Sequence, residues 1–154
     1  MDAVRQADSA DAEDIGQLLH DFNTEFDEPS PGPGALAERV RDLLADDEIT
    51  VLLTTDEPPQ GLAVLRFRPA IWSQAFECYV AELYVRPDRR GHGLGRALMQ
   101  AAIELARDRG ADQMELGTGE DDAVARALYE GLGFSNRGGR ADGPVNYLYE
   151  RELL

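Results

Sequence analysis

The sequence contains no lysine, and all fifteen of its basic residues are arginine. This absence excludes chemistry that forms a Schiff base on a lysine side chain. It also excludes the phosphate-binding P-loop, whose motif requires a lysine followed by serine or threonine. We therefore expect any phosphate group to be bound by backbone N–H groups and arginine side chains.

Cysteine is almost as scarce, because Cys78 is the sole thiol. A single cysteine forms no disulfide within the chain, and no suitably placed histidine is available to activate Cys78 as a nucleophile. No cluster of histidine, cysteine and carboxylate residues has the spacing of a metal site. We therefore expect a reaction that uses neither a metal nor a cysteine nucleophile.

Long apolar runs are also missing. No stretch approaches the roughly 20 apolar residues that a membrane span requires, and the first residues show no basic-then-apolar signal segment. The net charge of −15 produces a surface that repels nucleic acid and anionic membranes. These features predict a cytoplasmic protein that binds neither. The acidic surface could attract a cationic substrate, or it could serve solubility alone.

The length of 154 residues suits a single domain over residues 1–154. Alternating and helical apolar patterns indicate an α/β fold, with a mixed central sheet and helices on both faces. The connections on either side of a glycine-rich loop require parallel strand pairing there. We predict strands over residues 4–7, 49–54, 62–68, 79–85, 113–116 and 145–152, with four helices between them.

The glycine-rich loop after the strand at 79–85 is the most informative feature. Glycines at 91, 93 and 95 let the backbone approach a ligand closely, and a strongly periodic helix begins at Leu94. The unpaired N–H groups and positive dipole of that helix, next to adjacent arginines, predict a phosphate site. Arg96 stands where the dinucleotide-binding fingerprint has its third glycine, so that fingerprint does not apply. A solvated turn is the alternative.

Two motifs resemble those of the GNAT superfamily of N-acetyltransferases. The first is Arg90-x-x-Gly93-x-Gly95, which is similar to the family's pyrophosphate-binding motif. The second is the segment 125–134, Ala-Arg-Ala-Leu-Tyr-Glu-Gly-Leu-Gly-Phe. The resemblance extends over residues 3–152, and its specific part is residues 79–134. Asp122 departs from the pattern, because the family usually has asparagine there.

The resemblance implies a splayed sheet of six to seven strands that binds acetyl-CoA as cosubstrate, without a metal. The loop would hold the pyrophosphate, and the strand before it would pair with the amides of the pantetheine arm. His92 lies in this loop, and we assign it no catalytic role. The implied cofactor-binding residues are Leu83, Tyr84, Val85, Arg90, Gly91, His92, Gly93, Leu94, Gly95, Arg96, Asp122, Ala125 and Tyr129.

An amine attacks a thioester as the free base, so the reaction needs a proton acceptor near the amine and a donor near the sulfur. Tyr129 matches the family tyrosine that protonates the departing thiolate, although an aromatic on an amphipathic helix can also serve packing alone. Glu82 lies in an otherwise apolar strand, which favours a position facing an open site. Glu82 is the candidate base. Alternatively, a chain of water molecules takes the proton, and Glu82 has a structural role only.

These residues predict direct transfer of an acetyl group from acetyl-CoA to a primary amine of a small molecule or peptide. The rivals are a CoA-binding module without turnover and a nucleotide-phosphate enzyme. We expect the acceptor site to involve residues 27–34, 68–77 and 136–144. Acidic residues at 21–28 could recognise a cationic acceptor or form a solvated face. Family members are often homodimers, so a homodimer is one expected assembly.

Overall fold

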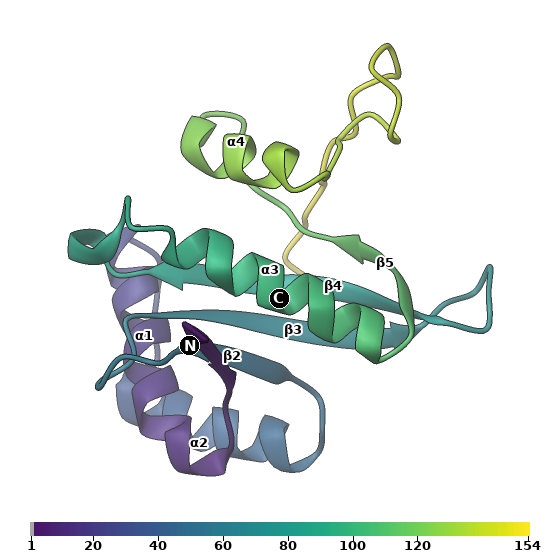
Figure 1. Ribbon diagram of the computed structural model, residues 1–154. Coiled ribbons are helices and arrows are strands. Elements are labelled where there is room, and N and C mark those ends of the chain that lie inside the picture. The colour runs from purple at the N-terminus through teal and green to yellow at the C-terminus, as the bar shows by residue number, and fades with distance from the viewer. Residues whose placement is uncertain (1) are drawn as a thin grey trace. The chain divides into compact units, whose positions relative to one another are not determined.

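The computed structural model describes residues 2–154 (Figure 1). These residues divide into two compact units, one that ends at Leu116 and one over Gly117–Leu154. None of the helices in the described part of the chain has the length and apolar character needed to cross a membrane.

The first unit is built on one five-stranded sheet in the order β1-β2-β3-β4-β5. The first three pairings are antiparallel and the β4–β5 pairing is parallel, which confirms the expected parallel crossover around the glycine loop. The strands are shorter or longer than expected by one to three residues at their ends. Their bounds are β1 Val4–Gln6, β2 Thr50–Thr54, β3 Gly61–Pro69, β4 Phe76–Val85 and β5 Ala111–Glu115.

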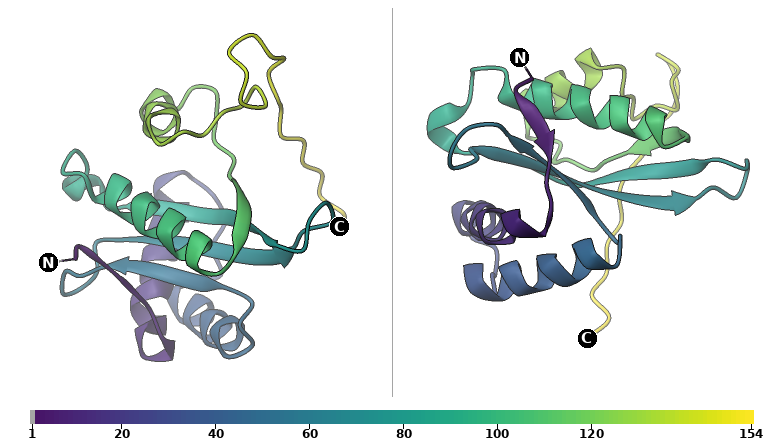
Figure 2. Two further views of the ribbon diagram at one scale, coloured as in Figure 1. Left: turned by 45° about the vertical axis from the view of Figure 1, so that its right-hand side comes forward. Right: turned by 60° about the horizontal axis from the view of Figure 1, so that its bottom comes forward.

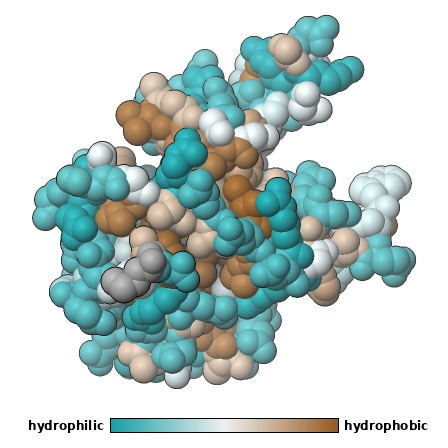
Figure 3. All heavy atoms as spheres, in the orientation of Figure 1, coloured by the Kyte–Doolittle hydropathy of each residue, from teal (hydrophilic) through white to brown (hydrophobic). Residues whose placement is uncertain are grey.

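Helices cover both faces of this sheet, as Figures 1 and 2 show. The helices α1 (Ala12–Glu25) and α2 (Pro33–Ala45) lie on one face, and α3 (Leu94–Asp108) lies on the other. Each helix directs its apolar stripe at the sheet, because burial of apolar area is the main stabilising contribution to the fold. The fully buried residues with the largest side chains include Ile15, Leu18, Leu53, Leu62, Leu65, Leu98 and Met99. The outer surface on the face drawn in Figure 3 is mostly hydrophilic.

The contact between α1 and α2 depends on a glycine. A Cβ on Gly16 would lie 2.6 Å from the carbonyl oxygen of Pro33 and 2.8 Å from the backbone nitrogen of Ala37. Those atoms belong to the backbone of α2, so they cannot move aside as a side chain would. Glycine at this position therefore sets how closely the two helices approach, and with it where the end of α1 lies.

The second half of β4 has an open edge. β5 pairs with β4 only from Phe76 to Tyr79, whereas β3 pairs with β4 as far as Val85. No further strand among the described residues borders β4 over residues 80–85. The pairing between β3 and β4 also shifts register, because Val64 lies opposite Glu82 whereas Leu65 lies opposite Val80. Ala81 is therefore the extra residue of a β-bulge in β4, and such bulges often occur next to functional sites.

The second unit contains α4 (Ala123–Gly131) and irregular chain. The predicted strand over residues 145–152 is wrong, and the sheet has five strands rather than six to seven. A strand needs a neighbour for its backbone N–H and C=O groups. Within this unit no other segment is extended and paired, and the side chains of Tyr147, Leu148 and Tyr149 remain exposed.

Candidate active site

The glycine loop between β4 and α3 has a backbone conformation that favours glycine. Gly91 and Gly93 have φ angles of 80° and 81°, a region that residues with a Cβ rarely adopt. No atom lies within 4 Å of the position a Cβ would take on either glycine, so the loop surface is open there. Gly93 precedes the first residue of α3, Leu94, and no side chain caps this helix.

The N–H groups of the loop are unpaired. Backbone hydrogen bonding stops at the N–H of Arg90, which donates to Pro87 over 3.4 Å, and resumes at Ala97, which donates to Gly93 over 3.0 Å. In the described part of the chain, no hydrogen bond is formed by the six N–H groups of residues 91–96. Six neighbouring donors at the positive end of a 15-residue helix form a cradle for an anion.

The arginines before the loop are paired with carboxylates. Arg86 donates to Asp21 at 2.6 Å, and Arg89 lies 3.4 Å from Asp56. Arg90 donates to both carboxylate oxygens of Glu25, each at 2.8 Å. Asp21 and Glu25, the two carboxylates on α1 in these pairs, are therefore not part of a merely solvated acidic face.

Sequence analysis missed these pairings. A signal was available, because residues 21 and 25 are one helical turn apart and present both carboxylates on one side of α1. The partners could not be identified, since the contacts join segments 65 residues apart.

Tyr84 contributes its backbone, but not its side chain, to the open edge of β4. Its ring is buried and stacks on Phe22 with the ring centres 4.8 Å apart. Its hydroxyl donates to Glu25 at 3.1 Å. Burial and the nearby carboxylate raise the pKa of Tyr84 to about 12, so the phenol keeps its proton at neutral pH. Its neighbours Leu83 and Val85 are both partly exposed.

Glu82 lies on β4 directly after the bulge, opposite Val64. It is half-buried, and no hydrogen bond or ion pair within 4.0 Å joins its carboxylate to another side chain among residues 2–154; the charge of Arg66 is its electrostatic neighbour. Burial raises the pKa of Glu82 above its ordinary value, and the charge of Arg66 only partly opposes that shift. A half-buried carboxylate with a raised pKa and no partner is suited to accept a proton.

In the second unit, Asp122 and Tyr129 have separate local roles. The carboxylate of Asp122 accepts a hydrogen bond from the N–H of Ala125 at 3.1 Å and caps α4. Tyr129 packs edge-on against Phe134 with the ring centres 6.1 Å apart. Burial raises the pKa of Tyr129, and the charge of Asp122 adds to the shift, so the hydroxyl remains a proton donor.

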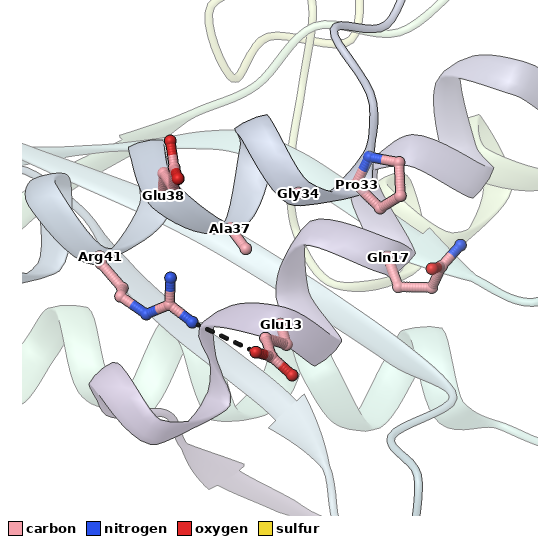
Figure 4. Close-up of a pocket in the computed structure, with 7 residues that line it drawn as sticks. All are labelled: Glu13, Gln17, Pro33, Gly34, Ala37, Glu38 and Arg41. Carbon is pink, nitrogen blue, oxygen red and sulfur yellow. Dashed lines mark ion pairs between the residues drawn. The ribbon is translucent and has the colours of Figure 1, made fainter.

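A separate hollow of about 390 Å³ lies between α1 and α2 (Figure 4). Arg41 and Glu13 form an ion pair at 3.6 Å across it. None of the predicted catalytic or cofactor-binding residues lines this hollow, so it is distinct from the glycine loop; Pro33 and Gly34, at the end of the segment 27–34 expected near the acceptor, do line it. Within residues 2–154 no group of three or more histidine, cysteine or carboxylate residues is arranged to hold a metal ion. The hollow is lined by Glu13, Gln17, Pro33, Gly34, Ala37, Glu38 and Arg41.

Similar proteins agree with this architecture. The chain superposes on the crystal structure of a protein from Arthrobacter sp. FB24 assigned as an acetyltransferase, with a TM-score of 0.88 and 45% sequence identity. That alignment covers 100% of this chain and 97% of the other. A thialysine N-epsilon-acetyltransferase of Caenorhabditis elegans is 26% identical over 126 residues, which is 81% of this chain and 78% of that protein.

A mycothiol acetyltransferase of Beutenbergia cavernae is 41% identical over 69 residues. The match spans 43% of this chain and only 23% of that longer protein. The model of the acetyltransferase (GNAT) family matches residues 13–134, which include strands β2 to β5, the glycine loop and α4. The chain therefore belongs to the GNAT family of acetyltransferases.

Proposed function

We propose that the protein transfers an acetyl group from acetyl-CoA directly to a primary amine. The observation that carries this proposal is the row of six unpaired N–H groups at residues 91–96, directly after the open edge of β4. A diphosphate fits the first feature, and an extended chain of amides fits the second. Acetyl-CoA contains both, in this order, followed by a thioester.

The open loop surface at Gly91 and Gly93 fits this ligand, because any side chain there would occupy the space the phosphates need. The backbone of residues 91–96 would hold the diphosphate, and Arg96, which is exposed, would add positive charge. The free edge of β4 at Leu83, Tyr84 and Val85 would pair with the pantetheine amides. A backbone N–H at this edge would also polarise the thioester carbonyl. Asp122 and Ala125 complete the proposed binding set.

The proposed reaction is a single displacement. The amine nitrogen forms a bond to the acetyl carbon, and the bond from that carbon to sulfur breaks. Glu82, whose pKa is raised by burial, takes the proton that the amine loses. Tyr129, whose raised pKa keeps its hydroxyl protonated, donates a proton to the departing sulfur. No acyl-enzyme forms on this route, which agrees with the placement of the sole thiol, Cys78, in the buried core.

An amine acceptor is the class that the relatives support. The names of two similar proteins, thialysine N-epsilon-acetyltransferase and mycothiol acetyltransferase, identify them as enzymes of acetyl transfer, and the first name specifies an amino group. The net charge of −15 on this chain favours the approach of a cationic amine. The names of the relatives and the net charge thus favour an amine, either on a small molecule or on a peptide.

Two measurements on one preparation test the proposal. CoA should raise the thermal midpoint, by an amount that grows with the logarithm of its concentration above Kd, and ATP should raise it less, since ATP lacks the amide-bearing arm. A panel of primary amines with acetyl-CoA should then show thiol release that depends on the amine. CoA binding without any amine-dependent release would identify a binding module without turnover. Equal effects of ATP and CoA would indicate a site for nucleotide phosphates.

A further inference from the structure

Arg90, the first residue of the glycine-loop motif, makes contacts that point back toward the protein. Its two terminal nitrogens donate to the two oxygens of Glu25 at 2.8 Å each. Its Nε donates to the carbonyl oxygen of Val85 at 2.9 Å, and its guanidinium lies over the ring of Tyr84 at 5.6 Å. A forked, two-bond contact between arginine and carboxylate fixes orientation as well as distance.

Glu25 is held from a second direction. Its Oε1 also accepts a hydrogen bond from the hydroxyl of Tyr84 at 3.1 Å. One turn earlier on α1, Phe22 stacks on the same tyrosine ring with an interplanar angle of 12°. The last turns of α1 thus contact the end of β4 in two ways: Phe22 stacks on the ring of Tyr84, and Glu25 accepts the hydrogen bond from its hydroxyl. A lone surface ion pair contributes little to a fold, but this pair belongs to a network of four groups with fixed geometry.

The network and a bound phosphate would compete for Arg90. To reach a phosphate, the guanidinium would give up both bonds to Glu25 and the bond to Val85. It would also leave the Glu25 carboxylate beside an anion. Six N–H donors at residues 91–96 are already unpaired and need no such rearrangement. The contacts therefore favour an Arg90 that stays in place while the backbone receives the phosphates.

We propose that Glu25 and Arg90 form a positioning clasp, which holds the start of the glycine loop and the end of α1 in one arrangement for acetyl-CoA. The role of Arg90 is then to orient the loop and not to bind phosphate. This proposal rests on the acetyl-CoA-dependent function proposed above. It also extends to the acceptor side, because α1 ends at Glu25, two residues before the segment 27–34, where we expect part of the acceptor site.

The experiment is a double-mutant cycle with Glu25→Gln, Arg90→Gln and both changes together. We measure the KM for acetyl-CoA, kcat and the thermal midpoint of the ligand-free protein. We expect each single variant to raise the KM about tenfold with little change in kcat, which is the size expected for a charged hydrogen bond. The double variant should be no worse than either single one, because both remove the same contact.

Arg90→Lys separates positioning from phosphate binding. Lysine keeps the positive charge and binds phosphate well, but it lacks the forked geometry. The clasp predicts that Arg90→Lys raises the KM nearly as much as Arg90→Gln. The matched control is Glu13→Gln, the same change on the same helix in an exposed ion pair with Arg41, and it should leave the KM unchanged.

Several results would overturn the clasp. One is a Glu25→Gln variant that binds acetyl-CoA more tightly than wild type, since that outcome marks Glu25 as a competitor for a phosphate-binding Arg90. Others are a near-normal KM for Arg90→Lys, or an unchanged KM for both glutamine variants in an active protein. If the wild-type protein itself neither binds CoA nor releases thiol, the proposed function fails first, and the clasp fails with it.

Discussion

The unit that ends at Leu116 and the unit over Gly117–Leu154 differ in how their apolar residues are used. In the first, leucines such as Leu53 and Leu62 have no exposed surface. In the second, α4 has no buried residue, and Leu148 is 70% exposed. An apolar pattern alone therefore does not produce a core, because each apolar face also needs a neighbouring element to pack against.

The groups proposed for binding and catalysis are also distributed over both units. The unpaired N–H groups, the open edge of β4 and Glu82 belong to the first unit. The proposed acid, Tyr129, belongs to the second. We therefore expect changes in the glycine loop to weaken ligand binding, and the change at Tyr129 to lower turnover alone.

The largest expected effect is on turnover, in Tyr129→Phe. The variant loses one hydroxyl and keeps its ring against Phe134, so packing in the second unit should survive. Loss of a general acid lowers kcat about 10²–10⁴-fold. CoA-induced stabilisation should stay near that of wild type. The loss should shrink for a thioester with a more acidic thiol, and a fall of less than about tenfold would reduce Tyr129 to a packing residue.

A matched pair of leucine variants tests the packing side of the comparison. Leu53→Ala creates a cavity in a fully buried site and should lower the free energy of unfolding by about 2–5 kcal/mol. Leu148→Ala changes a side chain that is 70% exposed and should stay within about 0.5 kcal/mol of wild type. Denaturant unfolding measures both. A loss at Leu148 as large as that at Leu53 would show that the second unit buries its apolar residues in solution.

Gly93→Asn tests the loop. Asparagine tolerates a positive φ better than most residues, so the fold should persist, but its side chain would lie in the open space over the N–H groups. We expect the stabilisation by CoA, about 2.7 kcal/mol at a concentration of 100 Kd in wild type, to fall close to zero. The control is Gly110→Asn, whose φ is 80° at the opposite end of α3. Equal CoA stabilisation in the two variants would place the phosphates elsewhere.

The smallest effect is expected for Glu82→Gln, as a change in the pH dependence of kcat/KM. A base must be ionised, so the wild-type rate falls as pH drops through the raised pKa of Glu82. Below the raised pKa the wild-type carboxyl is itself protonated, so the two profiles should converge there. Above that pKa the variant should be slower by about tenfold, and it should recover partly at still higher pH, because more amine is then unprotonated. Superimposable profiles would leave Glu82 with a structural role.

The same variant changes stability with a defined sign. Since burial raises the pKa of Glu82, the folded protein keeps a proton that the unfolded chain has already lost. The free energy of unfolding therefore falls as pH rises through the interval between the pKa of Glu82 in the unfolded chain and its raised pKa in the folded protein. Glutamine does not ionise, so Glu82→Gln should melt higher than wild type above the interval and converge with it below. A lower melting temperature at neutral pH would contradict a carboxylate that lacks a partner.

Local patterns in the sequence were sufficient for most of the first unit. The helical stripe after Leu94 predicted α3, and the connection around the glycines predicted the parallel pairing of β4 and β5. Glycine at 91 and 93 is compatible with the positive φ angles found there, and aspartate, as at Asp122, is a common N-cap residue. These features depend on a few neighbouring residues, which is why one sequence suffices to predict them.

Features that depend on distant partners could not be predicted in this way. The pattern at residues 145–152 suggested a strand, but a strand forms only beside another, and no local signal reports the missing neighbour. In the sequence Glu25 is one acidic residue among several. Its special role could not be recognised, because its bonds to Arg90 and Tyr84 join segments about sixty residues apart. The three segments expected at the acceptor site, residues 27–34, 68–77 and 136–144, contain no motif that would identify the amine.

The measurement that tests the central claim most directly is the joint product analysis of one reaction. Wild-type protein, acetyl-CoA and each amine of a panel are incubated together, and released thiol and acetylated amine are quantified in the same sample. The account predicts that, for at least one primary amine, the two products appear in equal amounts and increase with amine concentration. Thiol release that is independent of the amine, or the absence of acetylated amine across the panel despite CoA binding, would contradict it.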